Sequence, residues 1–175
     1  GRHHELTKVP SCKGILFDMS AYARQSVEMY QRLSGDTKLR KAATPFCPEG
    51  SLTADADEER GELSTHACAI VMKLLWLARL SRPDILKVVN NLATRVSKWS
   101  RNDDKQLYRL VCYLNDTQHY KLRAYINDPP EALKLRLYVD ADFAGDKEDA
   151  KSTVWGTACC SRSQFVLSSR VGKPQ

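Results

Sequence analysis

The stretch LRLYVDADFAGD, residues 135–146, decides the fold expected for the end of the chain. From residue 133, Leu and Val occupy the odd positions as far as 139, while Lys, Arg, Tyr and Asp occupy the even positions as far as 140. An apolar residue at every second position predicts a β-strand with one buried face. Gly145 interrupts the pattern, so the strand is expected to end with Asp140 and Asp142 on its polar side.

The two carboxylates at the end of this strand allow two interpretations. Asp140 and Asp142 offer the oxygen ligands that Mg²⁺ prefers, and many metal-dependent nucleases begin a cation site on such a rigid element. Aspartate is also common in the turns where strands end. The spacing alone favours the second interpretation.

The sequence around these aspartates resembles a known family. The run YVDADFAGD at 138–146, followed by DAKST at 149–153, is similar to the opening of the ribonuclease H domain of copia-type LTR retrotransposon Pol polyproteins. That family typically has Asp-Ala-Asp, Trp or Phe, Ala-Gly-Asp, a short polar spacer, and Lys or Arg before Ser-Thr. The resemblance implies that Asp140 is a catalytic residue and metal ligand, with Asp142 as a further candidate ligand and Mg²⁺ or Mn²⁺ as cofactor.

Composition predicts a globular protein with a polyanionic partner. The chain has 175 residues, of which 42% are hydrophobic and 27% charged, with a net charge of +6. These values are typical of folded rather than disordered proteins. The sequence pI of about 9.0 favours nucleic acid as the partner, ahead of an anionic membrane surface. No apolar stretch approaches the length of a membrane span, so no membrane insertion is expected.

The spacing of the cysteines indicates the redox state of the cellular compartment. All six are scattered, and without a Cys-x-x-Cys pair no zinc knuckle is expected. We expect reduced thiols and an intracellular protein, in the cytoplasm or the nucleus. The chain starts at Gly1 with neither a signal peptide nor an initiator Met, which predicts a fragment.

Residues 1–61 are expected to form an N-terminal segment from the end of a reverse transcriptase-like region. Residues 14–17 could form a short strand, and Ser20 is the expected N-cap of a helix that runs to about Leu33 and stops at Gly35. Prolines, glycines and clustered acids then indicate a loop over residues 36–62, the best candidate for a domain boundary.

Residues 62–117 are expected to form three helices in a small antiparallel bundle. Apolar residues recur at helical spacing from Leu63 to Leu80, and again from residue 85 to Trp99. Ser81 is the expected cap between these two helices, and Asn102 or Asp103 is expected to open the third. Residues 118–175 would form a β-hairpin or small sheet, an incomplete ribonuclease H-like start, so the predicted fold class is α+β.

Basic residues follow the second and third predicted helices. Their expected positions share one side of each helix, which suits contacts with successive phosphates. An ordinary solvated face explains the same pattern equally well. The candidate nucleic-acid-binding residues are Lys87, Arg95, Lys98, Lys105 and Arg109.

The helical segment extends the resemblance. Thr-Pro at 44–45, SRPDI at 81–85, NNLA at 90–93 and YLNDT at 113–117 are similar to the region after the polymerase palm in copia-type reverse transcriptases. The resemblance, over about residues 36–153, implies a thumb and connection that grip a template–primer duplex. The Tyr-x-Asp-Asp signature of the polymerase is absent, because Asp103 and Asp104 have Arg101 where the Tyr would stand. A polymerase metal site is therefore not expected.

After residue 153 the sequence departs from the family. Residues 150–175 contain no Asp or Glu, whereas a ribonuclease H site needs about four carboxylates around two cations. We expect the chain to be catalytically inactive alone. Back-translation of residues 154 onward with a shift of one nucleotide permits a family-like sequence, so a frameshifted gene fragment is one hypothesis.

Three functions compete. The first is an inactive fragment of a retrotransposon Pol polyprotein that binds a nucleic-acid duplex. The second is a metal-dependent nuclease that uses Asp140, Asp142, Asp146 and Asp149. The third is a simple basic nucleic-acid-binding module built on the helices.

Overall fold

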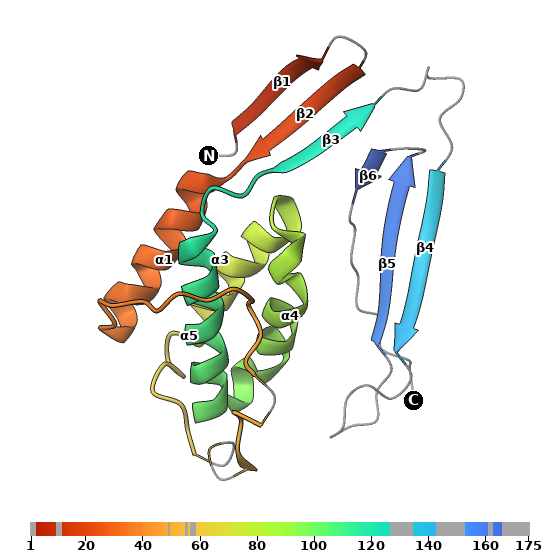
Figure 1. The fold of residues 1–175 in the computed structure, drawn as a ribbon. Helices are drawn as coiled ribbons and strands as arrows, with labels where there is room; N and C mark the ends of the chain where they lie inside the picture. Colours follow the sequence, from red (N-terminus) through yellow and green to blue (C-terminus); the bar gives the residue numbers. More distant parts are fainter. Residues whose placement is uncertain are drawn as a thin grey trace. The chain divides into compact units, whose positions relative to one another are not determined.

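A computed structural model describes residues 3–9, 12–48, 50–54, 56, 59–126, 135–142, 153–160 and 163–165. The fold is α+β, as predicted (Figure 1). Its elements in chain order are β1 (His3–Val9), β2 (Cys12–Asp18), α1 (Ser20–Ser34), α3 (Ala67–Leu80), the 3₁₀ turn η1 (Pro83–Ile85), α4 (Leu86–Arg95), the 3₁₀ turn η2 (Val96–Lys98), α5 (Arg101–Asp116), β3 (Leu122–Ile126), β4 (Leu135–Asp142), β5 (Thr153–Cys160) and β6 (Ser163–Phe165).

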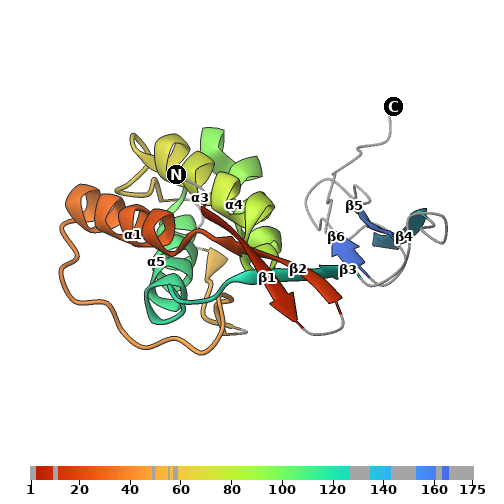
Figure 2. The same cartoon turned by 90° about the horizontal axis from the view of Figure 1, so that it is seen from above.

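The chain forms two compact units. The first runs from Phe17 to Leu122 and contains helices α1, α3, α4 and α5, while the second contains most of the described strand residues. In the first unit α1 contacts α3 and α5, and α4 contacts α3 and α5, so the helices form a small bundle (Figures 1 and 2). The domain limits drawn from the sequence at residues 61 and 117 stay predictions.

Helix α1 covers the predicted range but begins differently. Met19, not Ser20, is the N-cap residue, and its side chain makes no capping bond. Ser20 is already helical, and both its backbone N–H and its hydroxyl donate to Asp18 Oδ1, at 2.9 and 2.7 Å. The predicted stop is confirmed, because Gly35 has φ of +78°, a conformation that glycine adopts without steric cost.

Helix α3 begins at Ala67, four residues later than the sequence pattern indicated. Residues 62–66 form turns instead, because Asp104 accepts hydrogen bonds from the backbone N–H groups of Glu62 and Leu63, at 2.6 and 3.3 Å. The helix then buries one complete side against the bundle. Its buried residues are Ala67, Ile70, Val71, Leu74, Leu77 and Ala78.

Helices α4 and α5 bury most of the predicted apolar residues. The predicted start of α5 is wrong, because the helix begins at Arg101, one or two positions before the predicted residue, and Ser100 is its N-cap. The Ser100 hydroxyl accepts from the Asp103 N–H, and Asp103 Oδ2 accepts from the Ser100 N–H at 2.8 Å, which is a capping box. Val96 is only half-buried. The buried core of these helices includes Ile85, Val88, Val89, Leu92, Trp99, Leu107, Leu110, Val111 and Leu114.

The described strands form two sheets, with orders β1-β2-β3 and β4-β5-β6. The strand predicted at residues 133–142 is confirmed as β4, and β5 pairs with it antiparallel. The register places Asp140 opposite Trp155 and Asp142 opposite Thr153.

Candidate nucleic-acid interface

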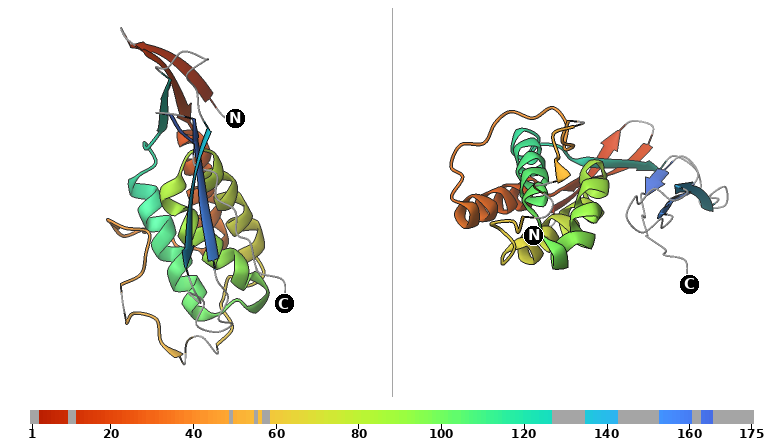
Figure 3. Two further views of the ribbon diagram at one scale, coloured as in Figure 1. Left: turned by 90° about the vertical axis from the view of Figure 1, so that its right-hand side faces the viewer. Right: turned by 90° about the horizontal axis from the view of Figure 1, so that it is seen from below.

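A continuous basic part of the helical unit covers α4, η2 and the start of α5. Residues 85–102 contain no Asp or Glu, and their charged residues are Lys87, Arg95, Lys98 and Arg101. Figure 3 shows these helices from two further sides. A segment of this kind attracts phosphate groups, although Arg101 is paired with Glu59 at 2.8 Å.

The outer side of α4 and η2 is polar and cationic. Lys87, Asn91, Thr94 and Lys98 are all exposed, and their spacing of three or four residues places them on successive turns of one helical side. We call these four residues the α4 stripe. The opposite side of α4 is buried in the bundle, so the stripe can only face solvent or a partner.

Arg95 has a structural partner instead. Its Nε donates to Asp103 Oδ1 at 2.8 Å, and the Asp103 side chain is fully buried. The Arg95 side chain is 27% exposed. Because Asp103 also closes the capping box with Ser100, Arg95 balances the charge of a buried carboxylate at the start of α5.

The two predicted binding residues on α5 also differ from one another. Lys105 is exposed, whereas Arg109 is half-buried. The Arg109 guanidinium donates to the backbone O and the hydroxyl of Thr44, at 3.0 and 3.4 Å, and so fastens the long loop before α3 to α5. Of the five predicted residues, three lysines are thus exposed and two arginines bind other parts of the fold. Their role in binding nucleic acid stays a prediction.

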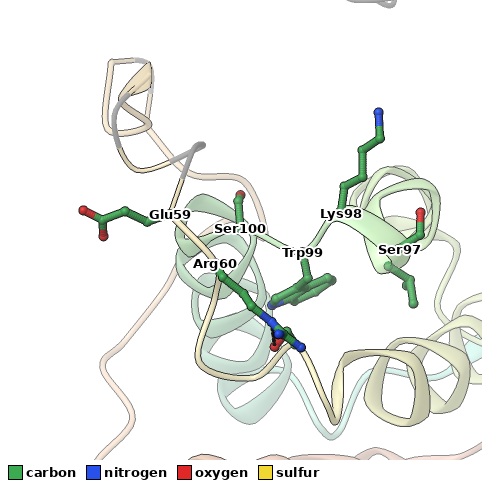
Figure 4. Close-up of a pocket in the computed structure, with 8 residues that line it drawn as sticks. Glu59, Arg60, Ser97, Lys98, Trp99 and Ser100 are labelled. Carbon is green, nitrogen blue, oxygen red and sulfur yellow. Dashed lines mark hydrogen bonds between the residues drawn. The ribbon is translucent and has the colours of Figure 1, made fainter.

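A pocket of about 380 Å³ lies beside the end of the α4 stripe. Arg60 borders it, with its Nε donating to Ser64 Oγ at 3.0 Å, and Lys98 borders it from η2. In Figure 4 the side chains of Arg60 and Trp99 extend to the same side, while those of Lys98 and Glu59 point in other directions. Sequence reasoning missed Arg60, since only the fold brings it to η2. The lining residues are Glu59, Arg60, Ser64, Val96, Ser97, Lys98, Trp99 and Ser100.

The loop that carries Arg60 is held closely against the start of α5. The Gly61 N–H donates to Trp99 O at 3.1 Å, and the Arg101 N–H donates to Glu59 O at 2.9 Å. A Cβ atom at Gly61 would lie 2.5 Å from Ser100 O, so this approach requires glycine. Trp99 is buried, and its indole N–H donates to Asp104 Oδ1 at 2.7 Å. The rim of the pocket is therefore held in place from both sides.

The Arg-Pro-Asp sequence at residues 82–84 connects α3, α4 and α5. Ser81 was expected to cap α4, but its hydroxyl donates to Phe17 O at 3.2 Å, and Arg82 precedes the 3₁₀ turn. Arg82 is only 2% exposed. It donates to Asp84 and, at 2.8 and 2.7 Å, to the backbone O and hydroxyl of Thr117.

The electrostatics of Asp84 follow from these contacts. Burial on its own raises the pKa of the Asp84 carboxyl, but the Arg82 guanidinium and the Tyr113 hydroxyl more than offset it, so the pKa is lowered. The Tyr113 hydroxyl donates to Asp84 Oδ2 at 2.8 Å. We call Arg82, Asp84, Tyr113 and Thr117 the Arg82 cluster. The cluster contains the Arg82–Asp84 ion pair. Its other contacts connect this pair to α5 and so stabilise the fold.

The carboxylates considered for a metal site lie on β4 or outside the described ranges. Asp140 and Asp142 lie on β4, and their paired positions on β5 are Trp155 and Thr153. Within the described ranges, no three or more His, Cys, Asp or Glu residues come together in a way that could hold a metal ion. Asp146 and Asp149 lie outside those ranges. The roles of Asp140 and Asp142 as metal ligands stay predictions.

Among the described helices, none combines the length and apolar composition that a membrane span requires. No family model matches the chain, and no solved structure matches it. One curated protein is similar over 121 residues, which is 65% of this chain and 7% of the relative's length. This chain therefore corresponds to a small part of a much longer protein. That protein is the retrovirus-related Pol polyprotein from transposon RE1 of Arabidopsis thaliana, and the 31% identity over the matched residues supports an origin of this chain in a retrotransposon Pol polyprotein.

Proposed function

We propose that the chain is the part of a copia-type Pol polyprotein that extends from the end of the reverse transcriptase, its thumb and connection, into the start of ribonuclease H. Two observations support this. The sequence runs at 81–85, 113–117 and 138–146 follow the order of that family, and the curated relative is a retrotransposon Pol polyprotein.

The function proposed for the helical unit is binding of a nucleic-acid duplex through phosphates. The observation that carries it is the α4 stripe, an exposed polar side on a segment without acids. From Lys87 to Lys98 the stripe rises about 16 Å along the helix. A duplex presents one negative charge per about 1.7 Å of axis, so both lysines can meet phosphates of one duplex. Lys105 is a further exposed candidate, whereas Arg95 and Arg109 act mainly within the fold.

Catalysis by this chain alone is not part of the proposal. The polymerase signature is absent from the sequence, and residues 150–175 supply no carboxylate to join Asp140 and Asp142. A pair of cations needs about four carboxylates from several elements. Mg²⁺ or Mn²⁺ would be the cofactor of the intact family. The compartment that we expect is the cytoplasm or the nucleus, where nucleic-acid duplexes occur.

The test is binding of the full chain to a fluorescent RNA–DNA hybrid, measured by anisotropy. Lys87→Ala and Lys98→Ala should each weaken binding several-fold, because each removes one phosphate contact. Arg24→Ala is the matched control, since Arg24 is an exposed cation on α1. Equal effects of all three substitutions would show that only net charge matters and would contradict the proposed interface.

A further inference from the structure

The outward side of α3 carries an unusual combination of residues. Trp76 is 56% exposed and Met72 is 54% exposed, although the other side of this helix is among the most deeply buried surfaces of the unit. The two residues are four positions apart and therefore adjacent on the helix. Single exposed apolar residues are common on proteins, but a neighbouring Trp and Met on one helix offer a continuous apolar contact surface.

The charged residues along α3 have one sign. Residues 63–83 contain no Asp or Glu, while Lys73 precedes Trp76 by three positions and Arg79 follows it by three. Arg79 is exposed in the last turn of α3. The Lys73 ammonium lies 4.4 Å from the centre of the Tyr22 ring, and this contact fixes it beside the helix. The apolar surface is thus flanked by cations on the neighbouring turns.

We propose that Met72, Lys73, Trp76 and Arg79, the Trp76 platform, bind unpaired nucleotides of a single-stranded nucleic acid. A base would stack on the exposed indole, and Arg79 and Lys73 would contact the adjacent phosphates. Every base has a π-face, so stacking on Trp tolerates any sequence, and basic residues beside an aromatic are the usual composition of such sites.

The charge pattern decides between this partner and a protein. A protein that docks on the apolar side of a helix gains free energy from burying that side. This gain does not require that acidic residues be absent nearby. The absence of acids over residues 63–83 instead complements a polyanion. Paired bases inside a duplex already stack on each other, so an exposed indole adds affinity only for unpaired ones. The inference extends the proposed duplex binding to a second helix and a different form of nucleic acid.

The test is anisotropy of the full chain with labelled oligo(dT), oligo(rU) and an abasic oligonucleotide of the same length. Trp76→Ala should weaken binding of oligo(dT) and oligo(rU) about tenfold, and Trp76→Phe should retain most of the affinity. Phe46→Ala is the matched control, because Phe46 is 47% exposed in the loop before α3. The abasic strand should bind weakly and equally to wild type and Trp76→Ala. A preference for oligo(dT) or for oligo(rU) identifies the natural strand as DNA or RNA.

Three results would overturn the inference. One is affinity of Trp76→Ala for oligo(dT) and oligo(rU) equal to that of wild type, and another is equal binding of the abasic strand by wild type. The third is a change of oligomeric state in Trp76→Ala, measured by light scattering, with unchanged oligonucleotide binding, which would assign the platform to a second copy of the chain.

Binding to the RNA–DNA hybrid separates this inference from the proposed function. Trp76→Ala should leave hybrid binding unchanged, and Lys87→Ala should weaken it.

Discussion

The guanidinium of Arg82 makes two hydrogen bonds to the Asp84 carboxylate, from Nε to Oδ1 at 2.9 Å and from Nη2 to Oδ2 at 2.7 Å. The same guanidinium bonds Thr117 at the end of α5, and it faces the Tyr120 ring at 5.2 Å. Arg82 therefore joins the α3–α4 junction to the end of α5. A buried arginine with this many partners is retained for the structure of the unit.

Arg82→Ala should lower the free energy of unfolding by about 3 kcal/mol, because it removes the charged donor from both the Thr117 carbonyl and the Asp84 carboxylate. Chemical denaturation followed by circular dichroism measures this. Arg82→Lys should recover only part of the loss, since an ammonium cannot form the two parallel bonds. Arg24→Ala, at an exposed site on α1, should change stability by less than about 0.5 kcal/mol. A loss at Arg82 as small as that at Arg24 contradicts the structural role.

Arg95 and Lys87 should behave differently although both were predicted to bind nucleic acid. Arg95→Ala leaves the fully buried Asp103 with a weaker set of partners, so it should destabilise the fold by about 1–3 kcal/mol. Lys87→Ala, at an exposed position of the α4 stripe, should leave the unfolding curve unchanged and weaken duplex binding. Denaturation and anisotropy on the same samples separate the two effects. Equal unfolding curves for both variants would be inconsistent with the ion pair.

Gly61 and Gly35 should respond to alanine for different reasons. At Gly61 a Cβ atom would lie 2.5 Å from Ser100 O and 2.6 Å from the Trp99 ring, so the variant should lose about 2–3 kcal/mol by displacing the loop from α5. At Gly35 no atom lies within 4 Å of a Cβ, and only the φ of +78° is unfavourable, with a cost of about 1 kcal/mol. Thermal unfolding should give a lower Tm for Gly61→Ala than for Gly35→Ala. The reverse order would show that the 59–61 loop is not packed as described.

The contacts of Asp18 predict that the stability of the fold depends on pH. Its hydrogen bond with Lys121, at 2.7 Å, and those from Ser20 lower the pKa of the carboxyl from 3.8 to about 2. A pKa lowered in the folded state contributes stability that is complete above about pH 5 and is lost as the pH falls through about 2. Asp18→Asn should therefore lower the Tm at neutral pH and make less difference at pH 2. Glu28→Gln, at an exposed position of α1, is the control. A Tm difference for Asp18→Asn that stays constant over this range contradicts the lowered pKa.

Asp140 provides the test of catalysis. With Mg²⁺ or Mn²⁺, the full chain should not cleave the RNA strand of a hybrid, since residues 150–175 contain no Asp or Glu to complete a two-cation site. Cleavage that Asp140→Asn abolishes, and that Asp36→Asn leaves intact, would establish the nuclease interpretation instead.

Sequence reasoning succeeded where the determining contacts are local. The apolar positions of α5, such as Leu107 and Leu114, recur at helical spacing and are buried, and Gly35 ends α1 as predicted. The alternation over residues 133–140 predicted β4 in the same way. Such patterns depend on residues a few positions apart, so one sequence contains the necessary information.

It failed where distant residues decide. The late start of α3 depends on Asp104, which is more than 40 positions from Glu62. The burial of Arg82 depends on Thr117, and the attachment of Arg109 depends on Thr44. The position of Arg60 beside η2 likewise follows from backbone pairing with residues 99–101. The N-cap at Ser100 was an exception, since Ser100 and Asp103 have capping-box spacing that the sequence displays.

The most direct test of duplex binding by the α4 stripe is the salt dependence of affinity for the RNA–DNA hybrid. For wild type, log Kd should rise linearly with log salt concentration, as counterions are released from phosphates. The variant with both Lys87→Ala and Lys98→Ala should show a slope smaller by about 2, one for each phosphate contact removed. A double variant with the wild-type slope, or a wild-type chain whose binding does not depend on salt, would contradict phosphate contacts by this stripe.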